Sequence, residues 1–228
     1  MKTMNIFLLL APVLLAINLN TAEAKETHQP TKKTDLEQPN KWLKNGNERY
    51  LTGRIRKDGQ AKADIERLAK GLHPHTIVLS CSDSRVPPEL VFDQRLGELF
   101  VVRTAGESLD ANAIGSIEYA IEHLGAQNLL VMGHTSCGAV KAALDTFDGK
   151  DAGSPNLNKL VADIHPRISE FKGKQPTLNV EMETWANAKG VAQDLIRRSE
   201  IIAHAVKEGK VKISTSVYYL ENGKVKFE

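Results

Sequence analysis

The chain has 228 residues, of which 41% are apolar and 25% are charged, a composition typical of one globular domain with a buried core. The formal net charge is only +2 and no long basic block stands out, which disfavours nucleic acid as a partner. Aromatic residues make up 5% of the chain, too few for a platform on which bases would stack. We therefore expect no nucleic acid partner.

The first 24 residues have the pattern of a secretory signal peptide. Lys2 gives a positive start, residues 6–17 form an apolar stretch too short to span a bilayer comfortably, and Ala22-Glu23-Ala24 is a small-x-small cleavage site. The alternative is an uncleaved amphipathic anchor. We expect a periplasmic or secreted protein without stable membrane insertion, organised as a signal peptide (1–24), a flexible leader (25–34) and a single domain (35–228).

After the leader, predicted helices alternate with short apolar runs rich in branched residues. Pro166 is expected to kink the helix that contains it, because proline has no backbone N–H. Helices are predicted from about residue 35 and over residues 61–70, 111–124, 137–146, 157–171 and 180–207. Buried strands are predicted over residues 76–80, 98–103, 128–133 and 211–219, and an Asn-Gly turn at 221–224 returns residues 225–227 as an edge strand.

This alternation predicts an α/β fold, a central, mostly parallel four-stranded sheet with an antiparallel edge strand, flanked by helices. Apolar spacing places Trp42 in a stripe along the first helix and Tyr119 toward the core from the helix over 111–124. Neither a G-x-G-x-x-G motif after the first strand nor a Walker A motif is present, so a nucleotide cofactor lacks its phosphate cradle.

Two polar segments directly follow the first and third predicted strands. Cys81 opens the first segment, His134 and Cys137 lie in the second, and these two cysteines are the only ones in the chain. Ligands of parallel α/β sheets bind beyond the carboxyl ends of the strands, so the segments converge if the two strands are neighbours. Two sulfurs and one imidazole suit zinc. We therefore predict one Zn²⁺ per chain, held by Cys81, His134 and Cys137.

The fourth zinc position is expected to be open, or filled by Asp83. Water in an open position would have its pKa lowered toward about 7 and would become a hydroxide nucleophile. Arg85 can hold Asp83 through a bidentate pair, so that the carboxylate accepts the hydroxide's hydrogen bond and stays off the metal. We therefore assign catalytic roles to Asp83 and Arg85. Two alternatives remain open: a surface ion pair of little energetic worth, and a Cys81–Cys137 disulfide in an exported chain.

The segments over residues 81–90, 97–103 and 133–138 resemble the β-class carbonic anhydrases, and the resemblance extends from about residue 35 to 227. It implies reversible hydration of carbon dioxide to bicarbonate and a proton, a lyase reaction, with the same three zinc ligands and the same Asp/Arg pair. It also implies a substrate pocket lined by Phe100 and Tyr119. Such pockets lie at a dimer interface, so a homodimer or tetramer is expected.

This chain departs from the family's pattern at several positions. Leu72 stands where many members have Gln, and Val78 stands where members with an inhibitory bicarbonate site have Trp, although Arg103 of that site is retained. We therefore predict an open zinc site without this control. Thr104 and Glu107 stand where Asn is common, a difference to which we attach no role.

Two rival functions are kept beside the carbon dioxide reaction. One is hydrolysis of carbonyl sulfide or carbon disulfide at the same site, slightly favoured by the apolar Leu72. The other is a non-catalytic metal-binding or thiol-redox module, which predicts either zinc uptake without activity or a disulfide.

Overall fold

The computed structural model describes residues 35–228. The expected signal peptide and leader lie outside the described residues. Within residues 35–228, no helix combines the length and the apolar character needed to cross a bilayer.

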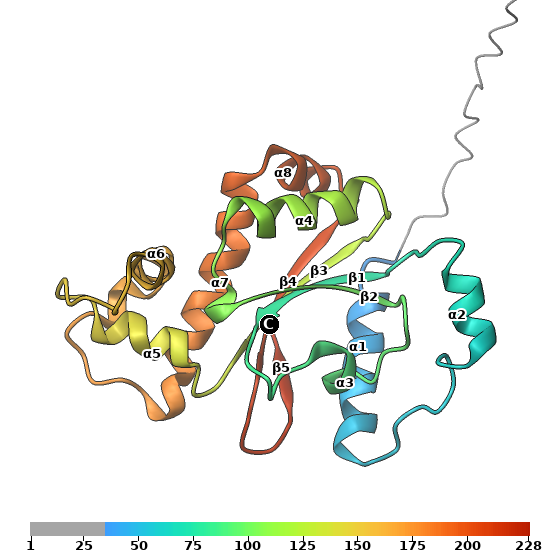
Figure 1. Ribbon diagram of the computed structural model, residues 1–228, viewed down its shortest axis with the longest axis horizontal. Coiled ribbons are helices and arrows are strands. Elements are labelled where there is room, and N and C mark those ends of the chain that lie inside the picture. The colour runs from blue at the N-terminus through green and yellow to red at the C-terminus, as the bar shows by residue number, and fades with distance from the viewer. Residues whose placement is uncertain (1–34) are drawn as a thin grey trace, which may run out of the picture. The chain divides into compact units, whose positions relative to one another are not determined.

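A five-stranded sheet forms the centre of this part of the chain, with the strand order β2-β1-β3-β4-β5 (Figure 1). The first four strands are parallel and β5 runs antiparallel to β4, so the predicted fold class is confirmed. The strands are β1 (Thr76–Cys81), β2 (Leu99–Thr104), β3 (Asn128–His134), β4 (Lys212–Tyr218) and β5 (Val225–Phe227).

Eight α-helices and three short 3₁₀ segments accompany the strands within residues 35–228, and α1 and α2 precede the first strand. The α-helices are α1 (Gln38–Leu51), α2 (Lys62–Leu68), α3 (Pro88–Val91), α4 (Ala111–Glu122), α5 (Gly138–Asp145), α6 (Pro155–Ile164), α7 (Glu181–Arg198) and α8 (Glu200–Lys207). The 3₁₀ segments are η1 (Ala105–Glu107), η2 (His165–Phe171) and η3 (Leu178–Val180).

Two of the predicted helices are interrupted. The helix expected over 157–171 changes from α6 to the 3₁₀ segment η2 next to Pro166, which confirms the predicted kink. The single helix expected over 180–207 is wrong, because Ser199 takes an extended conformation between α7 and α8. The Ser199 hydroxyl accepts a hydrogen bond from the backbone N–H of Ile202 and so caps α8.

Helices cover both faces of the sheet, and the apolar residues 77–79 of β1 and 129–132 of β3 alternate between two apolar clusters. Ile77 of β1 packs with residues of α4, α7 and α8. Its neighbour Val78 packs on the opposite face with residues of α1, α3, α5 and α6. Figure 1 shows α4 and α8 on one side of the sheet and α1 and α3 on the other. The sheet is therefore the middle layer between two helical layers.

Three burial predictions were wrong. The strand β2 lies at the edge of the sheet, so its side chains are half-buried rather than buried. Trp42 is exposed on α1, and Tyr119 on α4 keeps 52% of its surface exposed. In α1 the tightest contact is instead made by Gly46, because a Cβ atom there would lie 1.7 Å from the carbonyl oxygen of Phe92.

Candidate metal and active site

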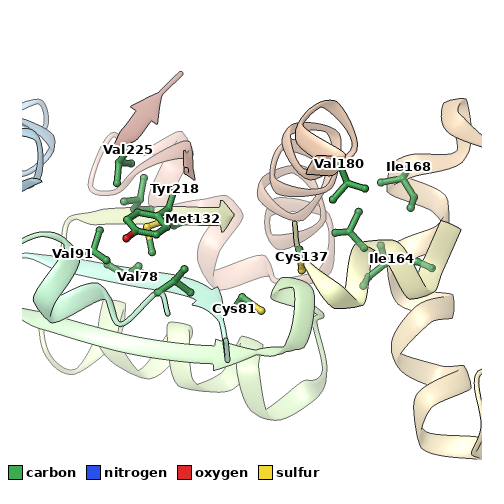
Figure 2. Packing of buried hydrophobic residues seen from close by; sticks show 14 of the residues in the cluster. Val78, Cys81, Val91, Met132, Cys137, Ile164, Ile168, Val180, Tyr218 and Val225 are labelled. Atoms are coloured by element: carbon green, nitrogen blue, oxygen red, sulfur yellow. The ribbon is translucent and has the colours of Figure 1, made fainter. Parts of the chain in front are cut away.

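Cys81, His134 and Cys137 come together at the carboxyl ends of two neighbouring parallel strands. Cys81 is the last residue of β1, His134 is the last residue of β3, and Cys137 is the N-cap of α5. Their candidate ligand atoms all lie within 4.8 Å of one another, and all three residues are buried. Figure 2 shows Cys81 and Cys137 among the apolar side chains of the cluster on the α1 face. The expected convergence is therefore present.

The donor atoms of this cluster fit a zinc ion. The Nδ1–H of His134 donates to the carbonyl oxygen of Thr135 at 2.9 Å, which leaves Nε2 as the lone-pair nitrogen. This Nε2 atom is buried and has no hydrogen-bond partner within residues 35–228. Both cysteines are free thiols, so the alternative disulfide between these two described residues is absent. Two sulfurs and one unpartnered imidazole nitrogen are a set that zinc binds.

The two cysteines have different pKa values, so that Cys81 carries the negative charge and Cys137 keeps its proton. The Cys137 thiol is the main cause of the lowered pKa of Cys81, about 4, and the hydrogen bond from the Gly106 N–H lowers this pKa further. The Cys81 thiolate, together with burial, raises the pKa of the Cys137 thiol. Without a cation the pair therefore keeps one proton, which a divalent cation would displace.

Arg85 holds the carboxylate of Asp83 at the rim of this cluster. The Nε and Nη2 atoms of Arg85 donate to the two oxygens of Asp83 at 2.9 and 2.6 Å, and its backbone N–H donates to Oδ1 at 2.9 Å. The Arg85 hydrogen bond is the main reason why the pKa of Asp83 lies well below its usual range. Asp83 Oδ2 lies 3.9 Å from His134 Nε2. A charged acceptor therefore faces the imidazole nitrogen.

Arg103 clamps the backbone between Cys81 and Asp83. Its Nε donates to the carbonyl oxygen of Cys81 at 2.9 Å, and its Nη2 donates to that of Asp83 at 2.6 Å. Val78 is fully buried in the core of the sheet. The guanidinium of Arg103 thus serves the loop that bears Cys81 and Asp83.

Sequence reasoning missed the role of Gly106. Its backbone N–H lies 3.4 Å from the Cys81 sulfur and donates to it. Gly106 has a φ of 62°, and a Cβ atom there would lie 2.8 Å from Cβ of Ala139. Only glycine fits this position without strain. The signal in the sequence is a glycine shortly after an edge strand, at the same end of the sheet as the two cysteines.

The residues expected to line the substrate pocket do not join the metal cluster within one chain. Phe100 packs with the cluster on the α4 face, whereas Cys81 and Cys137 belong to the cluster on the α1 face. Leu72 precedes β1, at the opposite end of that strand from Cys81, and lines a cavity of about 530 Å³ there. Leu72 therefore does not reach the metal cluster of its own chain, and its expected effect on a pocket between two chains stays a prediction.

The sequence and the fold are similar to those of known proteins. Residues 76–225 match the profile of a family described as carbonic anhydrase. Carbonic anhydrase 2 of Mycobacterium tuberculosis is 35% identical over 185 residues, which cover 81% of this chain and 88% of that protein. The carbonic anhydrase of Mycolicibacterium smegmatis is 38% identical over 187 residues, covering 81% and 89%.

Solved structures share the fold. Crystal structures of two tetrameric β-carbonic anhydrases from the ascomycete Sordaria macrospora include a chain with a TM-score of 0.61 and 20% identity. The superposition covers 84% of this chain and 93% of that one.

Proposed function

This chain belongs to the β-class carbonic anhydrase family, and on that premise we propose that Cys81, His134 and Cys137 hold the zinc ion with which it hydrates carbon dioxide. The reaction gives bicarbonate and a proton and is reversible. When bound, zinc supplies the Lewis-acid chemistry that makes water acidic enough to attack carbon dioxide near neutral pH. The observation that carries the assignment is the convergence of two buried thiols and an unpartnered imidazole nitrogen beside a held carboxylate.

The chain's own residues bind the metal and orient the nucleophile. Asp83 stays ionised because Arg85 engages both of its oxygens, so it can only accept hydrogen bonds at the site. A fixed acceptor selects one orientation of the attacking water, which is the positioning part of catalysis. Arg85 also keeps the carboxylate of Asp83 from moving toward His134 Nε2. Arg103 holds the backbone between Cys81 and Asp83.

We propose that the working enzyme is a homodimer or tetramer. The edge strand β2 and the exposed ring of Tyr119 are apolar surfaces on which a second copy can pack. Phe100 and Leu72 would then contribute to a pocket across the interface rather than within one chain. The relatives from Sordaria macrospora are described as tetrameric, which supports the proposal.

We also propose that the protein is exported and acts in the periplasm or outside the cell, where it equilibrates carbon dioxide with bicarbonate and protons. The pattern of residues 1–24 supports export. Cell fractionation tests the location. Recovery of the intact, uncleaved chain from the cytosol would overturn it.

Stopped-flow hydration of carbon dioxide by the zinc-loaded protein tests the activity. We expect turnover from mildly acidic to mildly alkaline pH, and a loss of about 100-fold in kcat/KM for Asp83→Ala and for Arg85→Leu at unchanged zinc content. The matched control is Glu66→Ala, which removes the carboxylate of an exposed ion pair with Lys62 on α2. Wild-type protein without hydration activity would overturn the enzyme assignment, and a fully active Asp83→Ala variant would reduce Asp83 and Arg85 to a surface ion pair.

The rival functions have less support in this structure. Hydrolysis of carbonyl sulfide or carbon disulfide is favoured only by Leu72, which lies at the far end of β1 from Cys81 and could reach a metal site only across the proposed interface. Comparing turnover on the three gases separates the substrates. A storage or thiol-redox module has no use for a carboxylate held off the metal by arginine, and it predicts zinc binding without hydration.

A further inference from the structure

Three polar side chains are fully buried on the first two turns of α7, facing the candidate metal site. Glu183, Thr184 and Asn187 have no exposed surface. Burying a polar group costs free energy unless it is hydrogen-bonded, so residues of this kind on a core-facing helix need a reason. Thr184 bonds a candidate zinc ligand itself, Asn187 bonds a residue that contacts one, and Glu183 bonds a segment that contacts the neighbour of one.

Thr184 supports His134. Its hydroxyl donates to the carbonyl oxygen of His134 at 3.2 Å. The methyl group of Thr184 leaves no room for a side chain on Gly133, the residue before His134, because a Cβ atom there would lie 2.6 Å from Thr184 Cγ2. The end of β3 is therefore seated directly on α7.

Asn187 supports Cys81 through the η1 segment. Its Nδ2 donates to the carbonyl oxygen of Gly106 at 2.9 Å and to Oε2 of Glu107 at 3.2 Å. The N–H of Gly106 in turn donates to the Cys81 sulfur. Gly106 and Glu107 both have positive φ, a conformation that a non-glycine residue keeps only when its surroundings hold it. Asn187 bonds both residues and so fixes the turn that presents the N–H to the sulfur.

Glu183 supports the segment that leads into Cys137. Its carboxylate accepts hydrogen bonds from the backbone N–H of Thr177, at 2.8 Å, and from the Thr177 hydroxyl. Thr177 is the N-cap of η3, and within η3 the carbonyl oxygen of Asn179 accepts from the N–H of Ser136 at 2.6 Å. Ser136, the neighbour of Cys137, has a φ of 58°. This strained residue is therefore held by a chain of bonds that starts on α7.

We propose that the start of α7 is a template that fixes the three ligand segments before metal binds. In it, Glu183, Thr184 and Asn187 act as positioning residues for Cys137, His134 and Cys81. The inference rests on the proposed zinc site. Residues that orient metal ligands from outside typically contribute about 10–100-fold to metal affinity. A ligand set already in place also avoids the ordering cost that binding would otherwise carry.

The test compares zinc affinity across matched variants of the full chain. Thr184→Val removes the hydroxyl and keeps the shape, Thr184→Ser keeps the hydroxyl, and Asn187→Ala removes the bonds to η1. The control is Asn40→Ala, because Asn40 is a buried asparagine that bonds Ser214 and Asn128 at the opposite ends of the strands. Zinc affinity is measured by chelator competition under reducing conditions, alongside the visible spectrum of the cobalt(II) form and the thermal unfolding of the metal-free protein.

We expect Thr184→Val and Asn187→Ala to bind zinc about 10–100-fold more weakly and to change the cobalt spectrum. Thr184→Ser and Asn40→Ala should keep both properties of the wild type, even though Asn40→Ala unfolds at a lower temperature. Wild-type zinc affinity and cobalt spectrum in Thr184→Val would overturn the template, whether or not Asn187→Ala folds. Wild-type protein that binds zinc at this site but does not hydrate carbon dioxide would instead overturn the proposed function alone.

Discussion

Arg167 is expected to contribute far more to stability than Arg197, although both bond the same carboxylate. The Arg167 side chain on η2 is only 2% exposed and donates to Asp163 at 2.8 Å and to Asp194 of α7 at 2.9 Å. Arg197 donates to Asp194 at 2.8 Å from a side chain that is 71% exposed. The stem of Arg167 packs over Gly190, where a Cβ atom would lie 2.6 Å from Arg167 Cγ. Arg167→Met therefore keeps this packing and removes only the guanidinium.

The magnitude follows from what the substitution leaves behind. Removing one partner of a buried ion pair costs about 3–5 kcal/mol, because the other charge stays buried and unpaired. Two features reduce this figure: Asp194 keeps 19% exposure, and Nη1 of Arg167 is buried without a partner within residues 35–228. We expect a loss of about 2–4 kcal/mol for Arg167→Met and about 0–1 kcal/mol for the exposed pair in Arg197→Met.

Urea unfolding of the metal-free protein at neutral pH measures the difference. With an m-value of about 2 kcal/mol/M, Arg167→Met should lower the midpoint by about 1–2 M, and Arg197→Met by less than about 0.5 M. If both variants lost the same amount, burial would not control the strength of these pairs and the reasoning would fail.

The effect of Arg167 should also depend on pH. Burial opposes ionisation of Asp194, but Arg197 and Arg167 together hold its pKa below the usual range. A carboxyl with a lowered folded-state pKa stabilises the protein above its unfolded pKa, about 3.9, and loses this contribution as the pH falls through the folded value. The gap between wild type and Arg167→Met should therefore narrow below about pH 4, and a constant gap would contradict the assignment to Asp194.

Two further predictions concern packing and the open metal position. Gly46→Ala should destabilise the protein by about 3 kcal/mol or more, because its Cβ would meet the carbonyl oxygen of Phe92. Gly115→Ala on α4, where a Cβ would have no atom within 4 Å, should stabilise the protein by about 0.5–1 kcal/mol. Thermal unfolding of both variants measures the two changes in stability. Arg103 is engaged by the backbone carbonyl of Asp83. Zinc-edge spectra at mildly acidic pH should therefore show no carboxylate ligand, and Asp83 bound to zinc there would contradict the predicted open metal position.

The convergence of the candidate ligands could be predicted because it needs only a general rule about parallel sheets. Cys81 and His134 each follow an apolar strand, and the carboxyl ends of neighbouring parallel strands meet at one edge. The bidentate contact of Arg85 with Asp83 is local, since the two residues lie two positions apart. Short-range spacing and one topological rule thus fix most of the candidate site.

The features of the fold and the site that could not be predicted depend on contacts that no local sequence pattern reveals. Tyr119 fits the apolar stripe of α4 by spacing, yet it is exposed because no element within residues 35–228 covers it. Ser199 ends α7 in a stretch whose composition favours one long helix, since its side chain bonds forward to Ile202 instead. In the sequence, Asn187 looks like a polar residue on the surface of a helix, and only the tertiary fold brings the carbonyl oxygen of Gly106 within reach of its side chain.

The distance along the chain between Cys81 and His134 has a consequence for folding. Of the three candidate ligands, His134 and Cys137 are close in sequence, so before β1 and β3 pair they can bind a divalent cation together without Cys81. Bringing Cys81 to them closes a long loop, and the entropy of that closure is lost before the third metal bond can form. The ion should therefore bind late and act as a cross-link between the two strands. A chain translocated unfolded would then acquire its metal in the compartment where the sheet forms.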